Sequence, residues 1–133
     1  MKRIVLALAF FAMPAFAAPV VTPLANTDKT VTGQVIVAPE HPAVIATVLT
    51  FPPGDKTAIH KHPWPHYAYM LEGVLTVTNT ETGKSFDVKA GEFLVEMRNT
   101  AHFGENRGTV PVKILIVDTV PAGVTSNSVV VVP

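Results

Sequence analysis

The chain has 133 residues, with 10 lysines and arginines against 10 aspartates and glutamates, and it contains no cysteine. This length predicts a single domain, and a balanced charge without a basic run argues against a nucleic-acid partner. The absence of cysteine excludes disulfides and thiolate metal ligands, so any metal ion must be bound by histidine and carboxylate groups.

The first 17 residues have the pattern of a secretory signal peptide. Lys2 and Arg3 precede an apolar run over residues 4–13, and the small-residue sequence Ala15-Phe16-Ala17 follows. The apolar run is about half as long as a segment that crosses a bilayer. We therefore expect cleavage near Ala17, a periplasmic or secreted protein, and no membrane association after cleavage. Residues 18–32 are expected to form an N-terminal arm.

The rest of the chain, residues 33–133, has the composition of an all-β domain. Seven short runs are rich in aliphatic, threonine and aromatic residues, and turns with proline, glycine or asparagine separate them. No stretch shows a helical period with end caps. The spacing of the runs predicts a β-sandwich or barrel. The expected strands are Ala43–Phe51, His66–Leu71, Val74–Thr80, Ser85–Val88, Glu92–Met97, Val112–Val117 and Ser128–Val132.

Several strands are apolar on both faces, most clearly Lys113–Val117, where Ile114 and Ile116 alternate with Leu115 and a valine. In a lone small barrel one of these faces would be in water. Either the chain's own termini or a second subunit could cover it. We favour a homodimer, in which the valine-rich tail, residues 129–132, would add a strand to the partner's sheet.

Four of the five histidines lie in two short blocks bounded by glycines, which we interpret as neighbouring strands. Two of them, His60 and His62, are two residues apart, so on a strand both side chains leave the same face and can hold a cation. Clustered imidazoles of this kind are most often metal ligands. The fifth, His41, is expected at the surface in a loop. The candidate metal ligands are His60, His62, His66 and His102.

Glycines and histidines follow a regular pattern in the two blocks, which read Gly54-x5-His60-x-His62-x3-His66-x6-Gly73 and Gly91-x5-Met97-x-Asn99-x2-His102-x3-Asn106. This pattern resembles the paired motifs of the cupin superfamily. In that family the first motif carries two histidines and a glutamate, and the second carries a proline, a glycine and a third histidine. The resemblance covers about the middle half of the chain. It implies a single-domain jelly-roll β-barrel (a double-stranded β-helix) that binds one divalent transition metal per chain.

Three positions depart from the cupin motifs. His66 stands where cupins usually place the glutamate ligand, Met97 replaces the proline, and Asn99 replaces the glycine. Without that glutamate the ion keeps its full positive charge, which favours an anionic substrate or hydroxide. The metal is expected to be Fe, Ni, Cu, Zn or Mn rather than magnesium or calcium. His66 is either a further ligand or a donor beside the ligands.

One carboxylate could restore the missing negative charge. Glu96 shares its alternation with Leu94 and lies where cupins usually have an apolar, inward-facing residue, so it would point into the barrel as a ligand or a base. In the alternative, a local bulge turns Glu96 to solvent and leaves Met97 inside. We take Glu96 as the candidate catalytic residue.

Aromatic residues flank the two histidine blocks, and their role can be interpreted in two ways. They either wall a ligand pocket or pack beside the core, and Asn106 either holds a loop or donates a hydrogen bond behind a ligand. The aromatic residues are Trp64, Tyr67, Tyr69 and Phe103.

Two classes of function follow from this reading. The first is a metal-dependent, dioxygenase-like oxidoreductase that acts on a small chelating enol, phenol or oxo-acid. The second is a non-catalytic periplasmic protein that binds a metal or a small ligand. A closed set of four ligands favours the second class, and an open coordination position favours the first. We favour the enzyme, because cupins with intact histidine sets are often catalytic.

Overall fold

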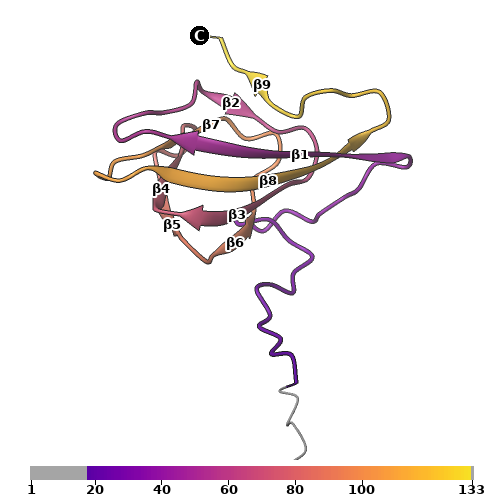
Figure 1. The fold of residues 1–133 in the computed structure, drawn as a ribbon. Coiled ribbons are helices and arrows are strands. Elements are labelled where there is room, and N and C mark those ends of the chain that lie inside the picture. The colour runs from indigo at the N-terminus through magenta and orange to yellow at the C-terminus, as the bar shows by residue number, and fades with distance from the viewer. Residues whose placement is uncertain (1–17, 133) are drawn as a thin grey trace, which may run out of the picture.

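The computed structural model describes residues 18–132, and the predicted signal peptide, residues 1–17, lies outside them. Within this part of the chain no helix is long and apolar enough to span a membrane. The secondary structure consists of strands connected by turns (Figure 1). The strands are β1 (Pro42–Phe51), β2 (His60–Lys61), β3 (His66–Glu72), β4 (Val74–Asn79), β5 (Ser85–Lys89), β6 (Phe93–Val95), β7 (His102–Glu105), β8 (Val112–Pro121) and β9 (Val129–Val130).

The strands form two antiparallel sheets, which confirms the all-β jelly-roll barrel predicted from the sequence. One sheet has the order β1-β8-β3-β6, and the other has the order β5-β4-β7-β2-β9. Consecutive strands often lie in different sheets, as β3 and β4 do, so segments far apart in the sequence become neighbours (Figure 1). The histidine-bearing strands β2 and β7 pair in this way.

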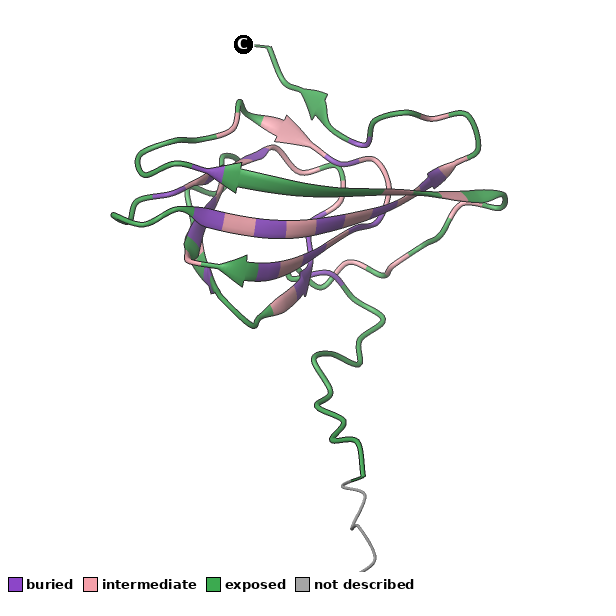
Figure 2. Ribbon diagram, viewed as in Figure 1, coloured by how far each residue is buried: buried purple, intermediate pink, exposed green. Residues whose placement is uncertain are grey.

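The hydrophobic core lies between the two sheets. In β8 the buried residues alternate with half-buried ones along the whole strand, so that Val112, Ile114 and Ile116 face the interior (Figure 2). They pack against residues of the opposite sheet such as Leu75 and Val77. Burial of each such side chain contributes about 1.5–3 kcal/mol, so this interior provides the rigid frame on which the histidines are mounted.

All seven predicted strands are present, with changes at their ends. β8 continues to Pro121, beyond the predicted end, because Asp118 and Val120 maintain its inward alternation. β6 ends at Val95, earlier than predicted, and the N–H of Glu96 donates instead to the carbonyl of His66. β2 and β7 have no counterpart among the predicted ranges, since both are short and lack an apolar alternation.

The two ends of the domain are tied to the barrel. In the N-terminal arm the N–H of Val31 donates to the carbonyl of Val95, 2.9 Å away. At the other end β9 pairs with β2 of the same chain, Val130 with His60. The valine-rich tail therefore adds a strand to a sheet of its own chain rather than to a partner's sheet, and the homodimer stays a prediction.

Two turns in the histidine blocks require special backbone conformations. Among residues 18–132, Asn99 is the only non-glycine residue with a positive φ, 54°, which asparagine and glycine tolerate best. This conformation accounts for the glycine that cupins usually have there. Gly73 has a φ of 77°, and a Cβ atom at this position would lie 2.8 Å from the carbonyl oxygen of Pro111. Any other residue at position 73 would be strained and would clash.

Candidate metal centre

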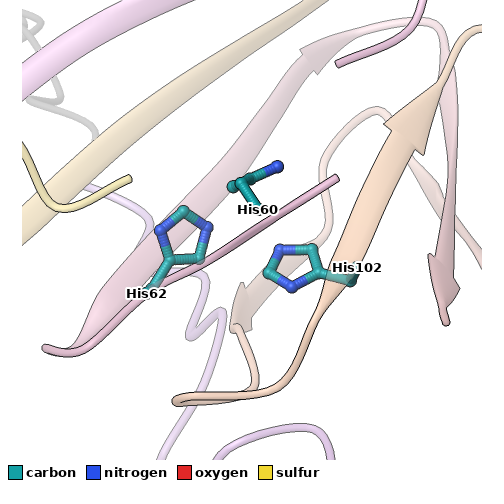
Figure 3. A group of neighbouring side chains, drawn as sticks. All are labelled: His60, His62 and His102. Carbon is teal, nitrogen blue, oxygen red and sulfur yellow. The ribbon is translucent and has the colours of Figure 1, made fainter. Parts of the chain in front are cut away.

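The four histidines predicted as metal ligands lie close together in the barrel interior, and their role as ligands stays a prediction. His60 in β2 is the direct cross-strand partner of His102 in β7, and their ring centroids are 4.6 Å apart. His62 follows β2, and its ring stacks on that of His66 at 3.7 Å. Figure 3 shows His60, His62 and His102 converging from the two neighbouring segments. All but His60 are buried.

Glu96 points into this cluster. Its Oε2 atom lies 2.9 Å from Nε2 of His102, 3.2 Å from Nε2 of His62 and 3.9 Å from Nε2 of His66. The alternative with Glu96 in solvent is not observed, because its side chain is only 8% exposed. Met97 is buried as well, which is possible because β6 ends at Val95 and the strand alternation stops there.

Two of the histidines are held by carbonyl groups close to them in the sequence. Nδ1 of His60 lies 2.8 Å from the carbonyl oxygen of Ala58, and Nδ1 of His102 lies 2.8 Å from that of Thr100. A carbonyl oxygen can only accept, so Nδ1 carries the proton, and in the neutral ring the lone pair is on Nε2. We call His60 and His102 the local pair.

The other two histidines are held by the C-terminal part of the chain. Nδ1 of His62 donates to the carbonyl oxygen of Asn127 at 3.1 Å, and Nδ1 of His66 donates to Oδ1 of Asp118 at 2.7 Å. The Asn127 side chain donates in turn to Asp118 at 2.6 Å and to the carbonyl of Trp64. Asn127 is therefore connected to both histidines. We call His62 and His66 the remote pair.

Asp118 and Asn127 were not predicted as site residues. Asp118 follows Val112, Ile114 and Ile116 in the inward alternation of β8, so a carboxylate at this position was a readable signal of a buried polar partner. Asn127 lies in a stretch without strand or helix periodicity, and nothing in its surroundings distinguishes it. It is nevertheless only 2% exposed.

The cluster shifts the proton affinities of its members in opposite directions. Burial lowers the pKa of His60 from 6.5 to about 4. Burial alone would also lower the pKa of His102, but the hydrogen bond with Glu96, the charge of Glu96 and the hydrogen bond with the Thr100 carbonyl together outweigh burial and raise it. Burial would raise the pKa of Glu96, yet the contacts with His102 and His62 hold it well below its usual range. A proton on Nε2 of His102 thus occupies the place where a metal ion would bind.

The donor set fits a transition metal ion. Nε2 of His62 is buried and has no hydrogen-bond partner of acceptable geometry among the described residues, although Glu96 is near it. A buried nitrogen lone pair of this kind is costly unless it binds a cation. One possible ligand group is His60, His62 and His102, and a second is His62, His66 and Glu96; within each group the ligand atoms lie within 4.8 Å of one another.

A cavity of about 210 Å³ opens onto the cluster, and all four histidines and Glu96 line it. Its remaining walls are mainly aliphatic and include Leu49 of β1 and Ile116 of β8. The four flanking aromatic residues, Trp64, Tyr67, Tyr69 and Phe103, are all described and do not line it, so they pack elsewhere. Asn106 holds a loop: its side chain donates to the carbonyls of Phe51 and Val110.

Solved structures with a similar fold include enzymes of three kinds. A polyketide cyclase of Streptomyces resistomycificus matches with a TM-score of 0.53 and 20% identity, over 65% of each chain. An oxalate decarboxylase of Lactobacillus farciminis has a TM-score of 0.55 and 23% identity, over 66% of this chain and 26% of the other. A cupin-superfamily sugar phosphate isomerase of Silicibacter pomeroyi has a TM-score of 0.51 and 20% identity, over 58% and 50%. At these identities the likeness concerns the fold alone.

Sequence comparison gives a more specific result. An uncharacterised protein of Methanocaldococcus jannaschii is 37% identical over 67 residues, which are 48% of this chain and 50% of the relative. The chain thus matches about half the length of that relative. The cupin domain model matches residues 47–118, which include all four clustered histidines and Glu96. Because this match covers more than half of the chain, the protein belongs to the cupin family.

Proposed function

We propose that this protein is a periplasmic or secreted metal-dependent oxidoreductase of the dioxygenase type, acting on a small chelating enol, phenol or oxo-acid. His60, His62 and His102 would hold one divalent transition metal ion, and His66 and Glu96 adjoin it. The observation that carries the proposal is the cavity that reaches all five side chains. A site built only for storage would not need such an opening.

The residues of the cluster have distinct roles in this proposal. A bound ion would supply Lewis acidity and, if it is redox-active, a means of reacting with dioxygen. The Nδ1 hydrogen bonds of the histidines fix the orientation of their rings. Contacts with His102 and His62 hold the pKa of Glu96 well below its usual range, so its carboxylate is charged at neutral pH. Its Oε2 atom faces the cluster and would accept the hydrogen bond of a substrate hydroxyl there. The mainly aliphatic walls leave the histidines and Glu96 as the main polar groups that a substrate would meet in the cavity.

The similar solved structures are compatible with catalysis but do not choose the reaction. They include a cyclase, a decarboxylase and an isomerase, so this fold supports several chemistries. The dioxygenase proposal therefore depends on the ligand set and the cavity of this chain.

A second candidate is a non-catalytic protein that binds a metal or a small ligand. One observation favours it: Oε2 of Glu96 lies 2.9 Å from Nε2 of His102 and 3.2 Å from Nε2 of His62. If Glu96 joined His60, His62 and His102 as a fourth ligand of a tetrahedral ion, no position would remain for a substrate.

Metal analysis of the protein purified without a histidine tag, combined with X-ray absorption on the same sample, separates the two candidates. For the enzyme we expect stoichiometric iron, copper, nickel or manganese with exchangeable water among its neighbours, and oxygen uptake with chelating enols, phenols or oxo-acids. A closed zinc site of three nitrogens and one carboxylate oxygen, without oxygen uptake, would move the conclusion to the binding protein.

We also propose that the protein forms a homodimer through β1. This strand lies at the edge of its sheet, and its side chains Val44 and Val48 are 67% and 54% exposed. Exposed apolar edges of this kind are usually covered by a partner. Light scattering after size exclusion should give twice the chain mass, and Val44→Glu should give the monomer. A monomeric unmodified protein would contradict this proposal.

A further inference from the structure

The residues that line the cavity limit the charge and the shape of its ligand, which the proposed dioxygenase reaction does not. Building on the metal site of the proposed function, we propose that the cavity selects a small monoanion with a branched aliphatic body and discriminates against dianions. The inference follows from the size of the cavity, the charges around it and the groups at its mouth.

The size of the cavity limits the ligand. Its volume is about 210 Å³, below the range of about 300–1,000 Å³ that is typical of sites for drug-sized ligands. Leu49 and Phe51 of β1 and Ile114 and Ile116 of the neighbouring β8 line one side of it. A ligand of a few carbon atoms with branched methyl groups would fill such walls and displace water from them.

Positive charge at the cavity would come from the bound ion alone. No lysine or arginine is among the described residues that line it. Two carboxylates already lie at the same end, Glu96 in the cluster and Asp118, 2.7 Å from His66. One carboxylate of a ligand would pair with the ion there, whereas a second carboxylate at the other end of the ligand would lie among aliphatic side chains without a cation, which is costly.

Among the described residues, the mouth of the cavity offers hydroxyls but no cation to a second carboxylate. Leu49 and Val130 both line the cavity and are 39% and 59% exposed, so they mark its opening. The hydroxyl of Thr57 accepts a hydrogen bond from the N–H of Gly104 and keeps its own proton to donate. Ser128 is exposed and provides one hydroxyl. A carboxylate at this end of the ligand would lose water without gaining an ion pair.

Two 2-oxo acids with the same chelating atoms test this inference. 4-Methyl-2-oxopentanoate carries an isobutyl body, and 2-oxoglutarate carries a carboxylate on a chain of similar size. Both are titrated into the Co²⁺-loaded protein, with the visible absorption of the ion as the readout. We expect the dissociation constant of 4-methyl-2-oxopentanoate to be lower by about tenfold or more.

A variant at the mouth provides the matched test. Leu49→Arg adds a cation to the lining at a residue that is already partly exposed, so it should reduce the preference roughly fivefold. Ala90→Arg places the same cation at an exposed turn after β5 that does not line the cavity and should leave the preference unchanged. A change of equal size in both variants would show that the cavity is not what discriminates.

The possible outcomes separate this inference from the proposed function. Equal or tighter binding of 2-oxoglutarate, or binding of neither oxo acid to the Co²⁺ protein, would overturn the inference. The preference combined with no oxygen uptake would leave the inference standing and would overturn only the enzymatic proposal. Failure to bind Co²⁺ at all would overturn both.

Discussion

The local pair, His60 and His102, and the remote pair, His62 and His66, reach the same cluster but are held in different ways. The local pair donates to carbonyls two residues earlier, at Ala58 and Thr100. The remote pair depends on Asn127 and Asp118, which are 65 and 52 residues away. The rings of the local pair are therefore oriented by their own short segments, whereas those of the remote pair are oriented only by contacts that the complete barrel provides.

The largest effect is expected from loss of a member of the local pair. His60→Ala or His102→Ala removes a nitrogen from the three-histidine group, and we expect stoichiometric metal to disappear. The melting temperature should also fall, since an ion that binds only the folded protein stabilises it by about 2.7 kcal/mol at a hundredfold excess over its Kd. Elemental analysis and thermal denaturation check both effects. Full metal content in both variants would contradict the assignment of the site.

A smaller effect is expected when the support of the remote pair is removed. Asp118→Ala deprives His66 of its acceptor and also releases the Asn127 amide, whose residue orients His62, so both members of the remote pair lose support. We therefore expect metal affinity to fall by about 10- to 100-fold. Asp118→Asn keeps an acceptor oxygen and should retain more of the affinity. Competition with a chromogenic chelator measures both, with the exposed Asp87→Asn as the control. If Asp118→Ala binds metal as the unmodified protein does, the remote pair needs no such support.

His66→Ala should weaken metal binding by about tenfold, less than any change in the local pair. The reason is that His66 belongs only to the second group of possible ligands, with His62 and Glu96. X-ray absorption would show one nitrogen neighbour fewer if His66 is a ligand. An unchanged affinity and an unchanged spectrum would assign His66 a role beside the ligands.

The smallest effect is on the pH dependence of stability in the metal-free protein, where His60 and His102 of the local pair act in opposite directions. Below pH 6.5 the unfolded chain protonates His60, but the folded protein does so only near pH 4, so stability falls as the pH drops. The raised pKa of His102 gives stability that is present below pH 6.5 and is lost as the pH rises through that pKa. Melting temperatures between pH 5 and 9 should therefore peak near pH 6.5.

Single variants test which histidine causes the fall in melting temperature on each side of this peak. His60→Gln should flatten the acid side and His102→Gln the alkaline side, whereas His41→Gln, at an exposed position, should change neither. A profile that keeps both slopes in the two cluster variants would place the titration elsewhere.

Most predictions from the sequence depended on two patterns, the spacing of the histidines and the alternation of inward and outward residues along the strands. The three motif histidines were found because ligands on neighbouring strands keep fixed intervals, and Glu96 was found because strand alternation pointed it inward. Asp118 also lay on an inward alternation, yet the predicted strand stopped at Val117. Asn127 could not be found, because its contacts with His62 and Trp64 depend on the return of the chain over the barrel, which no local pattern records.

The position of Asn127 also bears on when the site can be completed during synthesis. A chain leaves the ribosome from its N-terminal end, so His60, His62 and His102 are all present before Asn127, which follows His102 by 25 residues. Until then His62 lacks its acceptor, and Asp118 lacks the amide that holds it. An unfinished chain can therefore offer an ion only a partly oriented set of imidazoles. We expect the metal to be acquired late, by the finished chain, in whichever compartment completes its folding.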